Sequence, residues 1–151
     1  MAAGKQKTRR EVLRLRRSLA RAEQMLAELD RSLLAPEGIC ASDLDILERL
    51  QRKGSRPVNG LARRVGLTSG SITTAVQRLK RRGLVETRRD LKDKRVVVVS
   101  ITADGQKLAK RLNDDRTDAL VDAFQVWTDR ERTVVANLLK RLRRNLGDRN
   151  R

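Results

Sequence analysis

A polar face near the middle of the chain carries the side chains best suited to recognising another molecule. Between residues 69 and 82, Ile72, Val76 and Leu79 recur at the spacing of one buried helix face. The opposite face carries hydroxyl, amide and cationic side chains: Ser69, Ser71, Thr73, Thr74, Gln77, Lys80 and Arg81. In the major groove of DNA, glutamine can pair with adenine, and threonine methyl groups can contact thymine. The pattern predicts contact with base edges; its alternative is the polar face of any exposed helix.

Two short helices joined by a tight turn must position this face. The sequence predicts a supporting helix over residues 58–65 that packs against the helix over 69–82. Gly66 falls in the turn, where glycine adopts a positive φ at little cost. Ala62 is small where the helices cross, so their backbones can approach closely. This arrangement is a helix-turn-helix, and an ordinary helical hairpin is the alternative.

A basic hairpin is expected directly after these helices. Residues 84–88 and 96–101 are rich in β-branched residues, and the turn 89–95 between them is polar. A helix-turn-helix followed by a hairpin with a basic tip is a winged helix. A narrow minor groove concentrates negative potential and attracts an inserted arginine. The candidate DNA-binding residues of this wing are Arg88, Arg89, Lys92, Asp93, Lys94 and Arg95.

Three motifs, in order along the chain, carry a family resemblance. They are Gly83-Leu84-Val85-Glu86, Asp93-Lys94-Arg95 and Ser100-Ile101-Thr102-Ala103-Asp104-Gly105. Together they resemble the MarR family of bacterial transcriptional regulators. Two positions depart from the family pattern: Thr87 stands where arginine is frequent, and Ile101 replaces the usual leucine.

The resemblance covers about Leu44 to Leu112 and implies a homodimer that binds double-stranded DNA. It assigns Arg95 as the arginine of the wing and Asp93 as the acidic residue that holds the tip. The alternative is that these two side chains only form a hairpin salt bridge, which contributes little when exposed. The resemblance also implies that a small, usually aromatic or phenolic, effector of unknown identity releases the DNA.

The outer helices are predicted to form the dimer. The first runs from Thr8 to about Leu34, with residues 1–7 expected to be disordered. Its apolar residues follow a heptad pattern typical of packing against a partner helix: Val12, Leu15, Leu19, Ala22, Leu26, Leu29 and Leu33. One small winged helix cannot cover this face and those of the C-terminal helices. The prediction is therefore a single intertwined domain, with a dimerisation region over 8–35 and 103–147 and a DNA-binding region over 42–101.

The remaining helix ends are predicted from capping residues. Ser42 is the expected N-cap of the second helix, with Asp45 as its capping-box partner. Thr102 is expected to cap the helix to about Gln125. Thr128 and Glu131 are expected to cap the last helix, which ends near Leu146 before Gly147 and a charged tail. The expected fold class is mainly α with a small β-hairpin.

Composition excludes several classes of function. The 151 residues carry a net charge of +17, which favours a polyanionic partner. There is no histidine, no paired carboxylates in a likely cleft and no phosphate-binding glycine loop, so neither an enzyme, a cofactor nor a metal is expected. With only one Phe and one Trp, an aromatic-lined effector pocket is disfavoured. No segment predicts a membrane span, so the chain is expected to be soluble and cytoplasmic.

Cys40 is a possible redox or ligand-pocket residue. It lies between the first two helices, near the effector pocket that the resemblance implies. Its neighbours Ile39 and Ala41 provide no cation to activate the thiol, and a lone cysteine is more often a small buried hydrophobe.

Two functions of different classes follow. The favoured one is a sequence-specific regulator, a repressor of a pseudo-palindromic operator. The alternative is a basic coiled-coil architectural protein that coats nucleic acid without specificity, as the heptad and the charge alone would allow.

Overall fold

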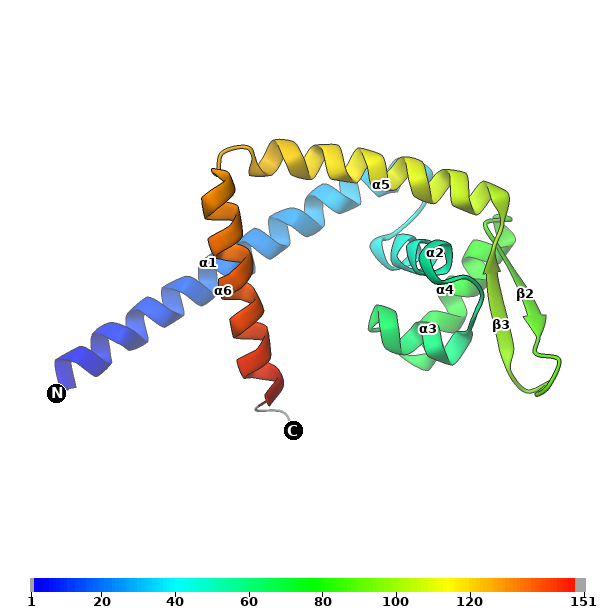
Figure 1. Ribbon diagram of the computed structural model, residues 1–151, viewed down its shortest axis with the longest axis horizontal. Coiled ribbons are helices and arrows are strands. Elements are labelled where there is room, and N and C mark those ends of the chain that lie inside the picture. Colours follow the sequence, from blue (N-terminus) through cyan, green and yellow to red (C-terminus); the bar gives the residue numbers. More distant parts are fainter. Residues whose placement is uncertain (1, 149–151) are drawn as a thin grey trace. The chain divides into compact units, whose positions relative to one another are not determined.

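The computed structural model describes residues 2–148, and most of them are helical (Figure 1). The chain forms two compact units that divide within one helix, between Asn113 and Asp114. The elements in order are α1 (Ala2–Leu34), a 3-10 turn (Ala35–Glu37), α2 (Ala41–Lys53), β1 (Arg56–Pro57), α3 (Val58–Val65), α4 (Ser69–Arg81), β2 (Val85–Arg89), β3 (Val97–Ile101), α5 (Ala103–Phe124) and α6 (Asp129–Asp148). The expected class, mainly α with a winged helix-turn-helix, is confirmed.

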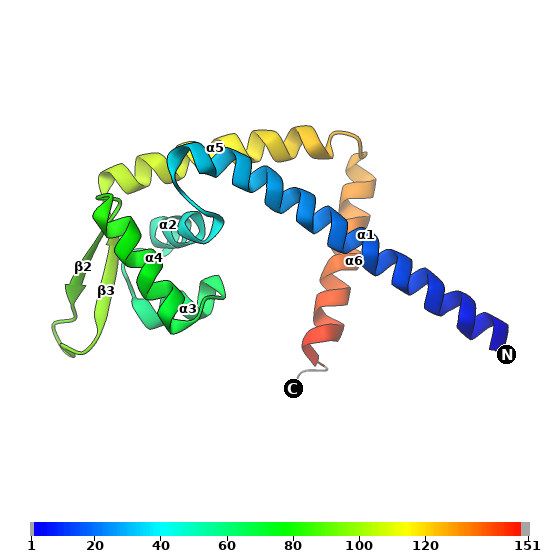
Figure 2. The ribbon, with the colours of Figure 1, turned by 180° about the vertical axis from the view of Figure 1, so that it is seen from behind.

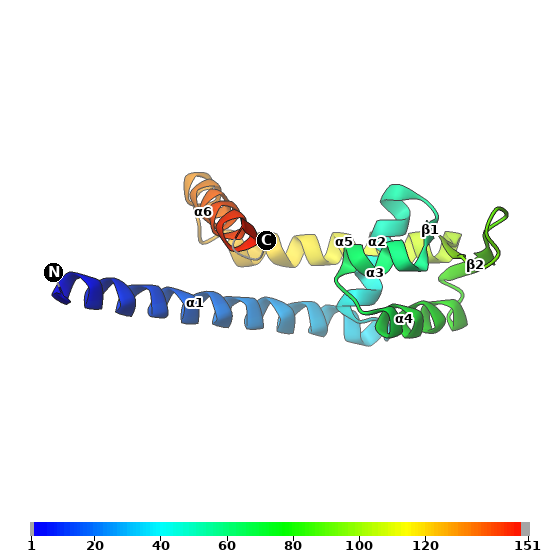
Figure 3. The same cartoon turned by 90° about the horizontal axis from the view of Figure 1, so that it is seen from below.

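The hydrophobic core lies inside the winged helix. Ile72 and Leu79 of α4 are fully buried against α2 and α3. Leu61 and Ala62 of α3 are buried with them. Figure 3 shows α3 and α4 side by side. Because the apolar residues of α4 all point to this core, the opposite face of the helix is left exposed, as the periodicity predicted.

The sheet has one more strand than expected. Its order is β1-β3-β2, and both pairings are antiparallel. Arg56 pairs with Val99, and Pro57 pairs with Val98, in a segment for which no strand was predicted. A two-residue strand is too short to show alternation. Proline tolerates the edge of a sheet, where its missing N–H is not needed.

Both terminal helices are longer than expected. α1 begins at Ala2 rather than Thr8, so the expected disorder of residues 2–7 is wrong, and Met1 lies outside the described residues. This segment is mostly Ala, Lys and Gln, which favour helix. α6 continues through Gly147 to Asp148, and the rest of the expected tail lies outside the described residues.

The cap of α2 differs from the prediction. Cys40, not Ser42, is the N-cap, and Asp43, not Asp45, completes the capping box by accepting a hydrogen bond from the Cys40 N–H at 3.2 Å. The sequence offered two Ser/Cys–Asp pairs at the same spacing. The pair that begins two residues earlier, Cys40 and Asp43, also contacts α4, as described below.

The predicted caps of the last two helices are confirmed. Thr102 Oγ1 accepts from the Gly105 N–H at 3.0 Å. Glu131 Oε2 accepts from the N–H and the hydroxyl of Thr128, each at 2.8 Å. These two hydrogen bonds stabilise the ionised carboxylate and lower the pKa of Glu131.

The start of α5 is fixed to the base of the wing. A Cβ at Gly105 would lie 2.1 Å from the carbonyl oxygen of Leu84, so only glycine fits there. Thr102 donates its hydroxyl to the Gly83 carbonyl at 2.7 Å and its N–H to the Leu84 carbonyl at 3.1 Å. These contacts determine where β2 and β3 leave the helical core (Figure 1).

Two further structural findings concern residues 2–148. None of their helices combines the length and the apolar character needed to cross a membrane. In the same part of the chain, no cluster of three Cys, Asp or Glu side chains could hold a metal ion.

Candidate nucleic-acid interface

The exposed face of α4 carries all seven side chains predicted for it. Each of these residues is exposed: Ser69, Ser71, Thr73, Thr74, Gln77, Lys80 and Arg81. The helix begins at the N-cap Thr68, whose Oγ1 accepts from the Ser71 N–H at 3.2 Å. The Ser71 hydroxyl lies 2.8 Å from the same oxygen, so Ser71 takes part in the cap as well as in the exposed face.

The threonine hydroxyls of α4 are turned toward their own helix. Thr73 donates to the Ser69 carbonyl at 2.9 Å, and Thr74 donates to the Gly70 carbonyl at 3.2 Å. In this rotamer the hydroxyl hydrogen is engaged, but the oxygen can still accept a hydrogen bond. These residues are therefore suited to accept from a base amino group or to contact a thymine methyl.

A groove of about 420 Å³ joins α4 to the wing. Thr73, Gln77 and Lys80 line it from α4, and Arg95 lines it from the wing. Pro57, Val58 and Asn59 close the end next to α3. The predicted residues of the two regions thus meet in one concave surface. The remaining predicted residues of α4 and the wing do not line this groove.

The wing tip is held by two carboxylates rather than one. Asp93 Oδ1 accepts from the backbone N–H of Arg95 at 2.9 Å. Among the described residues no ion pair joins the Asp93 and Arg95 side chains. Asp90 Oδ1 accepts from the N–H groups of Lys92 and Asp93, at 2.8 and 3.1 Å. These bonds, with a smaller contribution from the Arg88 charge, lower the pKa of Asp90.

The role of Asp90 was not identified from the sequence, although the pattern of residues around it indicates a turn. Aspartate before a short polar turn is typical of an Asx-turn, in which the side chain accepts from the backbone two residues on. Arg89 also has a role inside the wing, because its Nη1 donates to the Lys94 carbonyl at 2.7 Å. Within residues 2–148, the Arg95 guanidinium has no hydrogen-bond or ion-pair partner in the turn.

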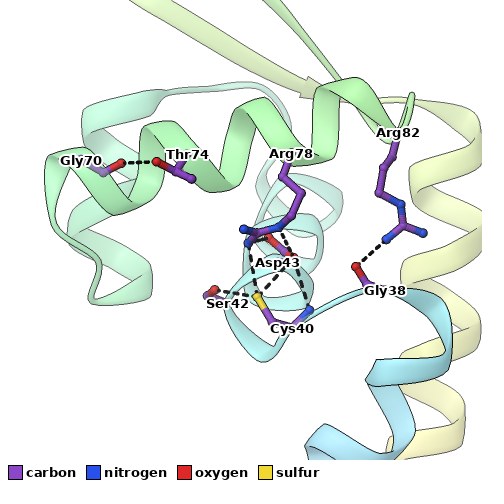
Figure 4. A network of polar contacts seen from close by, with 8 residues as sticks. All are labelled: Gly38, Cys40, Ser42, Asp43, Gly70, Thr74, Arg78 and Arg82. Atoms are coloured by element: carbon purple, nitrogen blue, oxygen red, sulfur yellow. Dashed lines mark hydrogen bonds and ion pairs between the residues drawn. The ribbon is translucent and has the colours of Figure 1, made fainter.

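Arg78 anchors α4 to the first turn of α2 (Figure 4). Its Nη2 donates to Asp43 Oδ1 at 2.6 Å, and its Nε donates to Asp43 Oδ2 at 3.0 Å. Asp43 is only 1% exposed. Hydrogen bonding to this carboxylate, together with its charge, raises the pKa of Arg78. A second anchor is one turn along, where Arg82 Nη1 donates to the Gly38 carbonyl at 2.8 Å.

Cys40 belongs to the same polar network. Its Sγ lies 3.3 Å from Arg78 Nη2, 3.2 Å from Asp43 Oδ2 and 3.2 Å from Ser42 Oγ. The adjacent residues Ile39 and Ala41 provide no cation, as the sequence indicated, but Arg78 of α4 does. Cys40 is also exposed rather than a buried hydrophobe.

The second compact unit brings the two aromatic residues together. Phe124 and Trp127 stand edge to face with ring centroids 5.2 Å apart. Both line a cavity of about 700 Å³ together with Leu120, Val121 and Arg132. The sequence disfavoured an aromatic-lined pocket because these residues are so few, but the turn between α5 and α6 places both rings at one cavity.

Fold and groove together define a winged helix-turn-helix DNA-binding protein. A model of the MarR family matches residues 38–96. The regulator MhqR of Bacillus subtilis, an HTH-type transcriptional regulator, is 26% identical over 124 residues, covering 82% of this chain and 86% of MhqR. The crystal structure of the transcriptional regulator BldR from Sulfolobus solfataricus superimposes with a TM-score of 0.75 at 27% identity, covering 89% of this chain and 96% of BldR.

A third comparison is with BpsR of Bordetella bronchiseptica. It has a TM-score of 0.71 at 22% identity, covering 83% of this chain and 90% of BpsR, and its DNA binding is regulated by 6-hydroxynicotinic acid. The chain is thus similar to MarR-family transcriptional regulators in sequence over residues 38–96, and it has the fold of a solved MarR-family structure. These relatives are named as regulators and not as enzymes.

The Arg78 anchor yields a stability prediction. Replacing Arg78 with Met leaves the buried Asp43 carboxylate without its strongest donors, so the free energy of unfolding should fall by about 2 kcal/mol. Urea unfolding at fixed protein concentration measures this change. The matched control is Arg81→Met on the exposed face of the same helix, which should change stability by less than about 0.5 kcal/mol.

A double-mutant cycle with Asp43→Leu tests the same anchor. The double variant should lose less stability than the sum of the two single variants, because the pair is removed together. Strict additivity would show that the two side chains are not energetically coupled.

Proposed function

We propose that the chain is a homodimeric, sequence-specific regulator of transcription that binds double-stranded DNA and represses from a pseudo-palindromic operator. The observation that carries this proposal is the groove shared by Thr73, Gln77, Lys80 and Arg95. It unites side chains that can contact base edges with cations that can contact the backbone. A protein that coats nucleic acid without specificity would not need this combination.

Each group in the groove has a defined part in binding. The Gln77 amide is suited to pair with adenine in the major groove. Lys80, at the C-terminal end of α4, is placed to contact a phosphate. Arg95 extends from the wing and is suited to the narrow minor groove beside the recognition site. The net charge of +17 adds attraction that depends on salt but not on sequence.

The exposed apolar residues of the outer helices support the homodimer. On α6, Leu138 is 53% exposed, Leu142 42% and Leu146 54%. On α1, Val12 is 58% exposed and Leu15 is 60% exposed. Both sets recur at helical spacing, and stripes of this kind on a chain of 151 residues are typical of an interface. A second copy, presenting the same stripes, would bring two α4 helices to successive major grooves.

We place the effector at the cavity lined by Phe124 and Trp127. Two aromatic rings and aliphatic neighbours suit a small planar ligand. BpsR, which has the same fold, is regulated by such a molecule. Cys40 remains a candidate for redox control, since its thiol lies beside Arg78 in the anchor of α4.

Competition between duplexes tests the DNA-binding proposal. Near physiological salt, the protein should bind its operator, found by selection from random duplexes, about a thousandfold more tightly than a scrambled duplex. Arg95→Ala should weaken operator binding by about 1–3 kcal/mol. The control is Arg144→Ala, which removes an exposed arginine of α6 that does not line the groove and should leave operator affinity unchanged. Equal affinity for both duplexes, with a steep salt dependence, would instead support the non-specific architectural protein.

Sedimentation tests the homodimer. The parent protein should sediment as a dimer, and Leu138→Glu should shift it toward the monomer because a charge enters the apolar stripe of α6. Leu91→Glu makes the same change at the wing tip, where the side chain is already 89% exposed, and should leave the dimer intact. A Leu138→Glu protein that stays fully dimeric would exclude this face of α6 from the interface.

The single tryptophan reports on the effector site. Among hydroxylated aromatic acids, 6-hydroxynicotinic acid included, one that quenches Trp127 fluorescence should also lower the affinity for the operator. Phe124→Leu should weaken both effects in parallel. Quenching with unchanged operator affinity would separate the cavity from control of DNA binding.

A further inference from the structure

Four arginines surround a second hollow, away from the groove of α4 and the wing. The cavity is about 450 Å³ and is lined by Arg49, Arg56, Gly60, Leu61, Arg63 and Arg64. Its residues come from α2, β1 and α3, and none of them is acidic. Gly60, Arg63 and Arg64 share the outer side of α3, because Leu61 and Ala62 point into the core, and Arg56 is contributed by β1.

The guanidinium groups of this arginine hollow are available to a ligand. In the part of the chain that the structure describes, none of the four forms an ion pair with a carboxylate. Guanidinium groups stay protonated at all physiological pH values, so gathering four of them is unfavourable unless anions balance the charge. Their planar donors match phosphate oxygens in pairs. The chemistry of the hollow is that of a site for phosphate groups.

Neighbouring side chains limit where the anion can lie. The adjoining hollow is lined by Asp45 and Glu48 as well as by Arg49, Arg52 and Arg64. Its mixed charge disfavours an anion on that side. The arginine hollow, which has no acidic lining residue, is therefore the favoured position for the anion.

The position of α3 indicates that the phosphate groups belong to the backbone of a DNA duplex. α3 has 8 residues, a length of about 12 Å. Its first residues line the groove of α4 and the wing, and its later residues line the arginine hollow. In a helix-turn-helix the first helix crosses the DNA backbone while the second enters the major groove. A duplex on α4 thus brings its backbone to α3, with one negative charge per about 1.7 Å of axis.

We propose that the arginine hollow binds backbone phosphates of the DNA duplex next to those contacted by α4 and the wing. This inference rests on the proposed function and extends its footprint from α4 across α3 to β1 and α2. The contact is independent of base sequence, so it contributes to affinity for every duplex and not to the choice between duplexes.

The test compares the salt dependence of DNA binding by the double variant Arg63→Gln/Arg64→Gln with that of the parent protein. Each lost phosphate contact should reduce the slope of log K against log salt by about 0.9, so the slope should fall by about 2. The reduction should be the same for the operator and for a scrambled duplex. Lys140→Gln/Arg144→Gln removes the same charge from the polar side of α6, where both residues are exposed, and should leave the slope unchanged.

A second variant fills the hollow and keeps its charge. No atom lies within 4 Å of a Cβ built at Gly60, and a side chain there also favours the helix. Gly60→Leu should therefore fold normally, as circular dichroism can verify, and bind both duplexes more weakly. An unchanged slope in Arg63→Gln/Arg64→Gln, or unchanged affinity in Gly60→Leu, would overturn the proposal.

Tripolyphosphate distinguishes the backbone from a free anion. If the double variant loses binding of tripolyphosphate in calorimetry but keeps the parental slope with DNA, the hollow serves a free phosphate compound and the proposal is wrong. The proposed function is judged separately, by the ratio of operator to scrambled affinity. If the protein shows no preference for the operator, the proposed function is wrong. The salt slope of Arg63→Gln/Arg64→Gln still tests whether the hollow binds backbone phosphates.

Discussion

The ion pair between Asp43 and Arg78 determines how the recognition helix is held. A carboxylate that is 1% exposed loses its hydration, and paired hydrogen bonds from a guanidinium offset that cost. The same carboxylate caps α2 by accepting from the Cys40 N–H. One buried charge therefore fixes the start of α2 and the last turn of α4 together. Figure 2 shows these two helices in the winged helix from behind.

The other anchors of α4 and the wing also use backbone groups. Arg82 reaches the Gly38 carbonyl, and Thr102 binds the carbonyl of Gly83 just past the end of α4. Close approach of Gly105 to Leu84 fixes the base of β2 against α5. With the helix and the wing base both fixed, little conformational entropy remains to be lost when a duplex enters the groove. Preorganisation of this kind increases affinity without adding contacts.

The cationic side chains of this winged helix have two roles. Arg78 and Arg89 have partners inside the protein and maintain its shape. The cations of the groove and of the arginine hollow face solvent and give the surface its positive potential. Their mutual repulsion reduces stability, which the buried apolar core must offset. A bound phosphate backbone would relieve that repulsion, so the positions that destabilise the free protein are those that favour the complex.

Local patterns in the sequence were sufficient to predict the helix-turn-helix, the buried side of α4, the caps at Thr102 and Thr128, and the family resemblance. Each depends on spacing within a few residues, which helical and strand geometry converts directly into a face or a cap. Tertiary structure alone decided the partner of Arg78, the choice of Asp43 over Asp45 as the cap and the strand at Arg56. Asp43 and Arg78 are 35 positions apart. No periodicity relates residues at that separation, because their contact depends on how α2 and α4 pack and not on the conformation of either helix.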